Sequence, residues 1–305
     1  CDAPEIKKDS DKMQIVTTIF PEYDWVREIL GEKLEEADVT MLLDNGVDLH
    51  SFQPTADDIL KIGTCDLFIY VGGESDSWVE DALKQKKNDK MEVINLLDVL
   101  GSSVKEEEIV EGMEAEEEEE PGQEEGTEYD EHVWLSLNNA KVLCSEISER
   151  LCRIDSGNSD AYKKNLESYT SELDKLDKDY QQTINNASKK TVLFGDRFPF
   201  RYLTDDYGLD YFAAFAGCSA ETEASFETVL FLAQKTDELG IPAVMTIDKS
   251  DQSIAKTIIE NTKNKDQKIL TLDSMQSATS DDVKNGTTYL SVMKSDLEIL
   301  EQALN

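Results

Sequence analysis

Short apolar runs alternate along the chain with segments whose apolar residues recur every three or four positions. Runs rich in β-branched and aromatic residues predict buried strands, and the three-to-four spacing predicts amphipathic helices. The predicted strands cover residues 13–20, 39–43, 66–71, 93–95, 191–195, 211–215, 243–247 and 268–272. The predicted helices cover residues 21–30, 56–62, 77–85, 138–154, 159–187, 199–207, 225–239, 253–263 and 289–304. Strands that alternate with helices favour parallel sheets with helical crossovers.

The segment 159–187 separates two such series of strands and helices. It has helical spacing throughout and contains neither glycine nor proline. At about 1.5 Å per residue it would be roughly 40 Å long, which is longer than one small domain is wide. We therefore expect an α/β protein of two lobes, each a parallel sheet flanked by helices, joined by one long spine helix. Ligands of open parallel sheets bind beyond the carboxyl ends of the strands, so a cleft between the lobes is the expected binding site.

This pattern divides the chain into four parts. They are a polar tether at residues 1–12, an N-terminal α/β lobe at 13–154, the linking helix at 155–188 and a C-terminal α/β lobe at 189–305. The N-terminal lobe carries an acidic segment, residues 106–131, in which every position from 116 to 120 is glutamate. Such a segment lacks core-forming residues and repels itself, so we expect a loosely ordered inserted loop.

Charge narrows the classes of ligand. The formal net charge is -36, from 66 acidic and 30 basic residues. A surface this negative repels nucleic acid phosphates and attracts cations. We expect no nucleic-acid partner, and the acidic segment would either raise the local cation concentration or serve as a solubilising insert.

The first residue is Cys1, and a polar stretch follows it. This is typical of a processed bacterial lipoprotein, in which the cysteine carries the lipid, although a chain that merely starts at cysteine would look the same. No apolar run is long enough for a transmembrane helix. We expect a lipid-anchored protein at the extracellular face of the cell membrane.

The chain contains only two histidines, His50 and His132, and both lie in predicted loops. Histidine is the commonest metal ligand, but a lone histidine can equally be a surface or core residue. Their context is more specific. Residues 15–26 (IVTTIFPEYDWV), 43–54 (LDNGVDLHSFQP), 65–72 (CDLFIYVG) and 130–136 (DEHVWLS) together resemble the metal-binding subunits of bacterial zinc and manganese ABC importers, the cluster A-I solute-binding proteins. The resemblance spans nearly the whole chain.

The resemblance implies that His50 and His132 bind the metal and that the second lobe supplies further ligands. One is an aspartate after a late strand, a role that falls to Asp273, whose other interpretation is a helix or turn cap. The other is a histidine or glutamate in an earlier loop, where this sequence departs from the family. There we expect Cys218, although a buried small hydrophobe, Glu221, Glu223 or a water are alternatives. Asp196, in Gly195-Asp196-Arg197, is a weaker candidate for a supporting role.

The donor types bear on the choice of metal. Two imidazoles with one carboxylate and one thiolate suit tetrahedral zinc, whereas two imidazoles with two carboxylates could accept manganese. The resemblance further implies a monomeric protein that binds one divalent metal, most simply zinc, and delivers it to a membrane permease of an ABC importer, without being an enzyme.

Two other classes of function stay open at this point. A zinc hydrolase would need an open coordination position and a general base, for which Glu131 or Asp48 would serve. An adhesin, a role ascribed to relatives, would need a host-binding surface that the sequence does not reveal. Motifs for nucleophilic hydrolases, nucleotide-binding loops and helical zinc proteases are absent from the sequence.

Overall fold

The computed structural model describes residues 12–114, 128–219 and 222–305. The predicted tether with Cys1, the centre of the acidic segment and Glu221 therefore lie outside the described residues. None of the helices that it describes combines the length and apolarity needed to cross a membrane.

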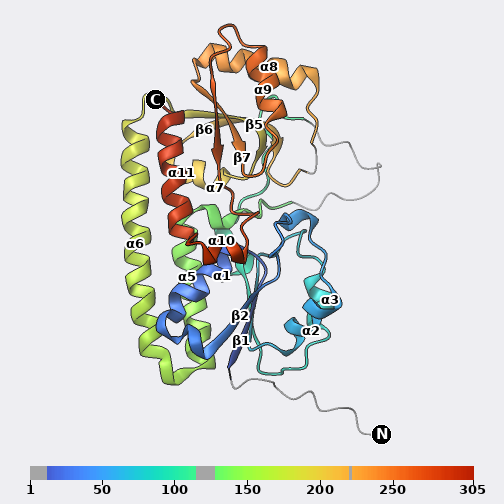
Figure 1. The fold of residues 1–305 in the computed structure, drawn as a ribbon, viewed down its shortest axis with the longest axis vertical. Helices are drawn as coiled ribbons and strands as arrows, with labels where there is room; N and C mark the ends of the chain where they lie inside the picture. Colours follow the sequence, from blue (N-terminus) through green and yellow to red (C-terminus); the bar gives the residue numbers. More distant parts are fainter. Residues whose placement is uncertain (1–11, 115–127, 220–221) are drawn as a thin grey trace.

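Two four-stranded parallel sheets form the centres of two lobes (Figure 1). The first sheet has the order β2-β1-β3-β4 and the second has the order β6-β5-β7-β8. The strands are β1 (Met13–Thr17), β2 (Ala37–Met41), β3 (Leu67–Tyr70), β4 (Glu92–Asn95), β5 (Thr191–Phe198), β6 (Asp210–Ala216), β7 (Ala243–Ile247) and β8 (Lys268–Leu272). Both sheets thus follow one topology, which confirms the predicted repetition of strand and helix order.

Helices flank both sheets. They are α1 (Phe20–Leu30), α2 (Ala56–Thr64), α3 (Val79–Leu83), α4 (Leu96–Leu100), α5 (Leu137–Ile154), α6 (Ser159–Asn186), α7 (Arg201–Tyr207), α8 (Phe226–Leu239), α9 (Ser253–Glu260), α10 (Ser280–Lys284) and α11 (Tyr289–Ala303). We call β1–β4 with α1–α5 the first lobe, and β5–β8 with α7–α9 the second lobe.

The long helix α6 is the predicted spine. Figure 1 shows it running along the side of both lobes, with α11 beside it. Its buried residues recur at helical spacing and pack against α1 and α5 of the first lobe and against α11. They are Tyr162, Tyr169, Leu173, Leu176, Tyr180 and Ile184. One apolar stripe on a single helix therefore contributes to a core that reaches both lobes.

Several strands and helices begin or end at other residues than predicted, because of local side-chain contacts. The first strand ends at Thr17 instead of residue 20, because the buried Glu22 accepts hydrogen bonds from the backbone N–H groups of Thr18 (2.8 Å) and Ile19 (3.3 Å) and so starts α1. Helix α2 extends to Thr64, beyond the predicted end at residue 62, and the buried free thiol of Cys65 follows it as the C-cap. The short helices α4 and α10 were not predicted.

The most consequential difference lies in β5, which extends to Phe198 and not only to residue 195. Its pairing with β6 shifts register between Phe194 and Arg197. Such an irregularity re-aims the side chains that follow it, and Arg197, directly after the shift, contacts Asp48 of the first lobe. Both lobes meet at this end of the second sheet.

Candidate metal centre

His50 lies in a one-turn 3-10 helix, Leu49–Ser51, that follows β2 of the first lobe. Asp48 caps this turn, because its Oδ1 accepts the backbone N–H of His50 at 2.9 Å. The cap fixes the backbone at the histidine, and the side chain of His50 is 13% exposed. His50 therefore projects from a rigid turn into a mostly enclosed space.

His132 is completely buried at the start of a second 3-10 helix, Val133–Leu135. Asp130 Oδ1 accepts the backbone N–H of His132 at 2.9 Å and lies 2.9 Å from its ring Nδ1. The ring also packs on Trp134, with centroids 5.3 Å apart. A carboxylate that accepts the Nδ1 proton sets the tautomer, leaving Nε2 with a lone pair for a metal.

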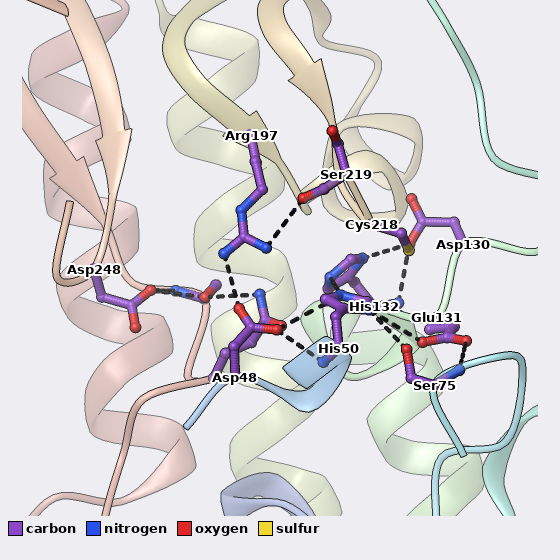
Figure 2. Close-up of polar contacts among 12 residues, drawn as sticks. Asp48, His50, Ser75, Asp130, Glu131, His132, Arg197, Cys218, Ser219 and Asp248 are labelled. Carbon is purple, nitrogen blue, oxygen red and sulfur yellow. Dashed lines mark hydrogen bonds and ion pairs between the residues drawn. The ribbon is translucent and has the colours of Figure 1, made fainter. Parts of the chain in front are cut away.

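The two Nε2 atoms face each other at 3.2 Å (Figure 2). On the far side of its ring, His50 Nδ1 lies 2.7 Å from Ser75 Oγ. Each imidazole thus has a polar partner at Nδ1 and directs Nε2 toward the other ring. Two nitrogens bound to one zinc ion at about 2.0–2.1 Å in a tetrahedron lie about 3.3 Å apart, so this separation matches a shared ion.

Cys218 follows β6 of the second lobe and completes a group of three possible ligands. One atom each of His50, His132 and Cys218 lie within 4.8 Å of one another, and this is the group of metal-binding residue types found in the described part of the chain. A side chain at Gly217 would stand only 2.8 Å from the Phe198 carbonyl oxygen and 3.1 Å from the His132 ring. Glycine there lets the loop that carries Cys218 approach the ring.

The electrostatics of the two rings differ. Burial and the neighbouring His132 lower the pKa of His50 to about 4, so that its ring is neutral at physiological pH. Burial also disfavours a proton on His132, but the Asp130 carboxylate more than compensates and raises the pKa of His132 above its usual value. A divalent ion at Nε2 would take the place of the second ring proton, and the negative charge of Asp130 would favour the ion in the same way.

The thiol of Cys218 is held protonated in the absence of a cation. Burial, followed by the nearby carboxylates of Glu107 and Asp130, raises its pKa far above the ordinary value. A bound metal reverses this preference, because a coordinating thiol is deprotonated outright. Two imidazoles and one thiolate are the donor set typical of zinc.

The other predicted ligands are not members of this group of three. Asp273 is not part of the group of three: its Oδ1 accepts the backbone N–H of Met275 at 2.7 Å, which makes it a turn cap. Burial and the adjacent Asp248 raise the pKa of Asp273 to about 6. Asp196 accepts backbone N–H groups through both of its oxygens and likewise supports a turn. Glu223 is exposed.

Three residues at the site were not assigned a role from the sequence. Ser75 contacts His50, Glu107 Oε1 accepts the backbone N–H of Cys218 at 2.9 Å, and Arg197 forms an ion pair with Asp48 at 2.8 Å. Of these three residues, only Arg197 had a signal in the sequence, because it directly follows Asp196, the weaker candidate for a supporting role. Glu107 was counted within the acidic segment and not as a separate contact.

Comparisons with known proteins find relatives that match nearly the whole chain. The family model described as "Zinc-uptake complex component A periplasmic" matches residues 15–303. The zinc-binding lipoprotein AdcA of Streptococcus pneumoniae is 29% identical over 299 residues, which cover 97% of this chain and 56% of that relative. The high-affinity zinc uptake system protein ZnuA of Bacillus subtilis is 29% identical over 296 residues, covering 96% and 88%. The chain spans about half the length of the AdcA relatives.

Solved structures show the same fold. The Zn(II)-bound ZnuA-like domain of Streptococcus pneumoniae AdcA superimposes with a TM-score of 0.73 at 27% identity, covering 96% of this chain and 99% of that domain. The laminin-binding protein Lmb of Streptococcus agalactiae, described as having adhesin and metal-transporting activity, gives a TM-score of 0.77 at 25% identity, covering 96% and 100%.

Proposed function

The chain belongs to the zinc-uptake complex component A (ZnuA) family, and from that premise we propose that it is the substrate-binding component of a metal importer. In this role it captures a zinc ion between its lobes and delivers it to a membrane permease. Zinc is the substrate of the protein and not a resident cofactor, so the site must both bind and release it.

The observation that carries the proposal is the facing pair of Nε2 atoms of His50 and His132, 3.2 Å apart, with the sulfur of Cys218 in the same group. The two histidines belong to the first lobe and Cys218 to the second, so one ion would link both lobes. A fourth position is open to a water or to a carboxylate such as Asp273. Opening of the lobes would remove the sulfur from the ion and favour release.

Zinc is the metal best suited to these donors. Thiolate and imidazole ligands favour zinc, whereas manganese prefers a larger share of oxygen ligands. The names of the relatives AdcA and ZnuA support the same choice. Manganese would become the better substrate only if carboxylates replaced the sulfur.

The location follows from the relatives as well. A relative is named a zinc-binding lipoprotein and the family is described as periplasmic, which supports a place outside the cytoplasmic membrane with a lipid anchor. We infer that the monomeric protein meets its permease there. The division into a tether, two lobes and a linking helix at residues 1–12, 13–154, 155–188 and 189–305 is part of this proposal.

Zinc is expected to stabilise the folded protein by mass action. At a free zinc concentration 100 times the dissociation constant, the gain is about 2.7 kcal/mol, which should raise the melting temperature by roughly 5 °C. Titration of metal-free protein in a zinc buffer, followed by thermal melting, measures both quantities. Magnesium at the same concentration is the control, since it prefers oxygen ligands. An unchanged melting temperature in saturating zinc would contradict the proposed function.

The described first part of the acidic segment, residues 106–114, contacts the second lobe. Glu114 donates its backbone N–H to the Ala214 carbonyl oxygen at 2.9 Å, and its carboxylate accepts the backbone N–H of Ser225. Glu107 supports Cys218 as described above. A test of the charge of this segment should therefore leave both glutamates in place.

Replacing the glutamates at positions 116–120 with glutamine is expected to slow zinc capture more than it weakens affinity. Long-range attraction mainly raises association rates, so the association rate should fall by about tenfold at low ionic strength and hardly at all at high salt. Stopped-flow competition with a fluorescent chelator measures it. The matched control neutralises five exposed carboxylates elsewhere, namely Glu80, Asp81, Asp281, Glu298 and Glu301. Equal rates at low salt would show that the segment only solubilises the protein.

A further inference from the structure

Arg197 connects the two lobes beside the metal centre. It lies near the end of β5, just after the register shift with β6. Its Nη2 lies 2.8 Å from Asp48 Oδ2, and its Nη1 donates to the Ser219 carbonyl oxygen at 3.5 Å (Figure 2). Asp48 precedes the ligand His50 by two residues, and Ser219 directly follows the ligand Cys218. One guanidinium therefore touches the segments that carry ligands from both lobes.

The carboxylate that pairs with Arg197, that of Asp48, also lies close to the metal centre. Its Oδ1 lies 3.9 Å from His50 Nε2, the ligand atom. Two atoms bound to the same zinc ion lie about 3.3–3.6 Å apart, so only a small rotation separates Asp48 from the coordination sphere. Both of its oxygens are engaged, Oδ1 by the His50 N–H and Oδ2 by Arg197. The backbone contact is part of a turn cap, and Arg197 supplies the opposing charge.

We propose that Arg197 sets the metal selectivity of the site by holding Asp48 out of the coordination sphere. The inference rests on the proposed function, because it concerns the same centre. Arg197 acts as a positioning residue: it does not touch the ion but determines which donors can reach it. While Arg197 holds Asp48 away from the ion, the centre offers two nitrogens and one sulfur, and these donors favour zinc over manganese.

Loss of the Arg197 guanidinium would leave the negative charge of Asp48 uncompensated beside the metal centre. The side chain of Asp48 is 23% exposed. Among the described side chains it forms ion pairs with Arg197 and, when that ring is protonated, with His50, so loss of Arg197 removes its one permanent cationic partner. A partly buried carboxylate without a partner is unfavourable, and an adjacent divalent ion is the strongest available replacement. Asp48 would then add an oxygen donor, and higher coordination with more oxygen suits manganese.

The experiment compares the purified full chain with four variants. They are Arg197→Gln, Arg197→Lys, Asp48→Asn and the double variant Arg197→Gln/Asp48→Asn. Arg150→Gln is the matched control, because Arg150 is similarly buried and pairs with Glu92 at 2.7 Å, both in the first lobe. Zinc and manganese affinities are measured by competition, and the visible spectrum of the cobalt(II)-loaded protein reports coordination number and sulfur ligation.

In Arg197→Gln we expect the manganese-to-zinc affinity ratio to rise by about tenfold, or about 1.4 kcal/mol, and the cobalt spectrum to weaken toward a five-coordinate form. Arg197→Lys keeps the charge and should stay within about threefold of the wild type. The double variant should match Asp48→Asn, since without the carboxylate the guanidinium has nothing to restrain. Arg150→Gln should leave the ratio and spectrum unchanged.

The outcomes separate the two proposals. If wild-type protein binds zinc but Arg197→Gln leaves the ratio and the cobalt spectrum unaltered, the role of Arg197 is wrong and the proposed function stands. The role is equally wrong if Arg197→Gln changes the ratio by the same factor whether or not Asp48 is present. If the wild-type chain binds no zinc at all, the proposed function itself fails.

Discussion

Replacing both His50 and His132 with alanine is expected to abolish zinc binding at physiological concentrations. The two rings supply the only imidazoles in the chain, and their Nε2 atoms face each other at 3.2 Å. Zinc sites with four protein ligands gain about 10–16 kcal/mol at neutral pH, so the loss of two donors should weaken binding on the order of a thousandfold or more. Equilibrium titration with a competing chelator measures the change.

Folding must be separated from ligation in this test. His132 is fully buried, so alanine leaves a cavity there that lowers stability whatever the metal does. The paired substitutions His50→Gln and His132→Gln retain more of the volume and some of the hydrogen bonding, while providing a poor zinc ligand. Both double variants should lose zinc binding although the glutamine pair stays folded in the absence of metal. Wild-type affinity in a folded glutamine pair would overturn the assignment of the site.

The second large effect is expected from Cys218→Ala. Removal of the thiolate should weaken zinc binding by about a hundredfold and eliminate the sulfur-to-metal charge-transfer absorption of the cobalt(II) form. Cys152→Ala is the matched control, because Cys152 is also a half-buried free cysteine but contacts Ser159 near the start of α6. Retention of the charge-transfer band in Cys218→Ala would show that sulfur at this position is not a ligand.

Cys218→Ala is also expected to change how the zinc affinity depends on pH. Burial, reinforced by Glu107, raises the pKa of the Cys218 thiol far above neutrality, so zinc must displace a proton from it. Affinity of the wild type should therefore rise with pH, by up to tenfold per unit from this one proton. His50 adds nothing to this slope between pH 6 and 8, since burial lowers its pKa to about 4. Cys218→Ala should lose the part of the slope that the thiol contributes.

The proposed site also explains how capture and release can share one centre. His50 lies in a turn that Asp48 caps, and His132 lies at the start of a second 3-10 helix of the first lobe, whereas Cys218 reaches them from the second lobe. Trp134 Nε1 donates to the Ser274 carbonyl oxygen at 3.0 Å, and Ser280 Oγ donates to Asp44 at 2.6 Å, so further polar contacts link the lobes around the centre. Side-chain contacts of this kind can break when two lobes separate, which the proposed delivery of the ion to a permease would require.

Most of the fold was predictable because its signals are local. Apolar runs marked all eight strands of the described residues, and the stripe from Tyr162 to Ile184 marked the spine helix α6. Helix caps depend on equally local contacts: the hydroxyl of Thr55 accepts the backbone N–H of Asp58, three residues later, at the start of α2. Where prediction failed, as at Thr17, the buried side chain of Glu22 accepts the next two backbone N–H groups and starts a helix.

The residues of the metal centre likewise include some that the sequence identified and some that only the structure revealed. The amino-acid sequence by itself determined the two-lobed α/β fold and singled out His50 and His132, because strand and helix periods and the motifs around these histidines are short-range patterns. Only the tertiary structure decided that Cys218 reaches them, that Asp273 caps a turn, and that Arg197 pairs with Asp48. Those outcomes depend on the register shift between β5 and β6 and on how two separate sheets face each other, and such long-range packing has no counterpart in local sequence periodicity.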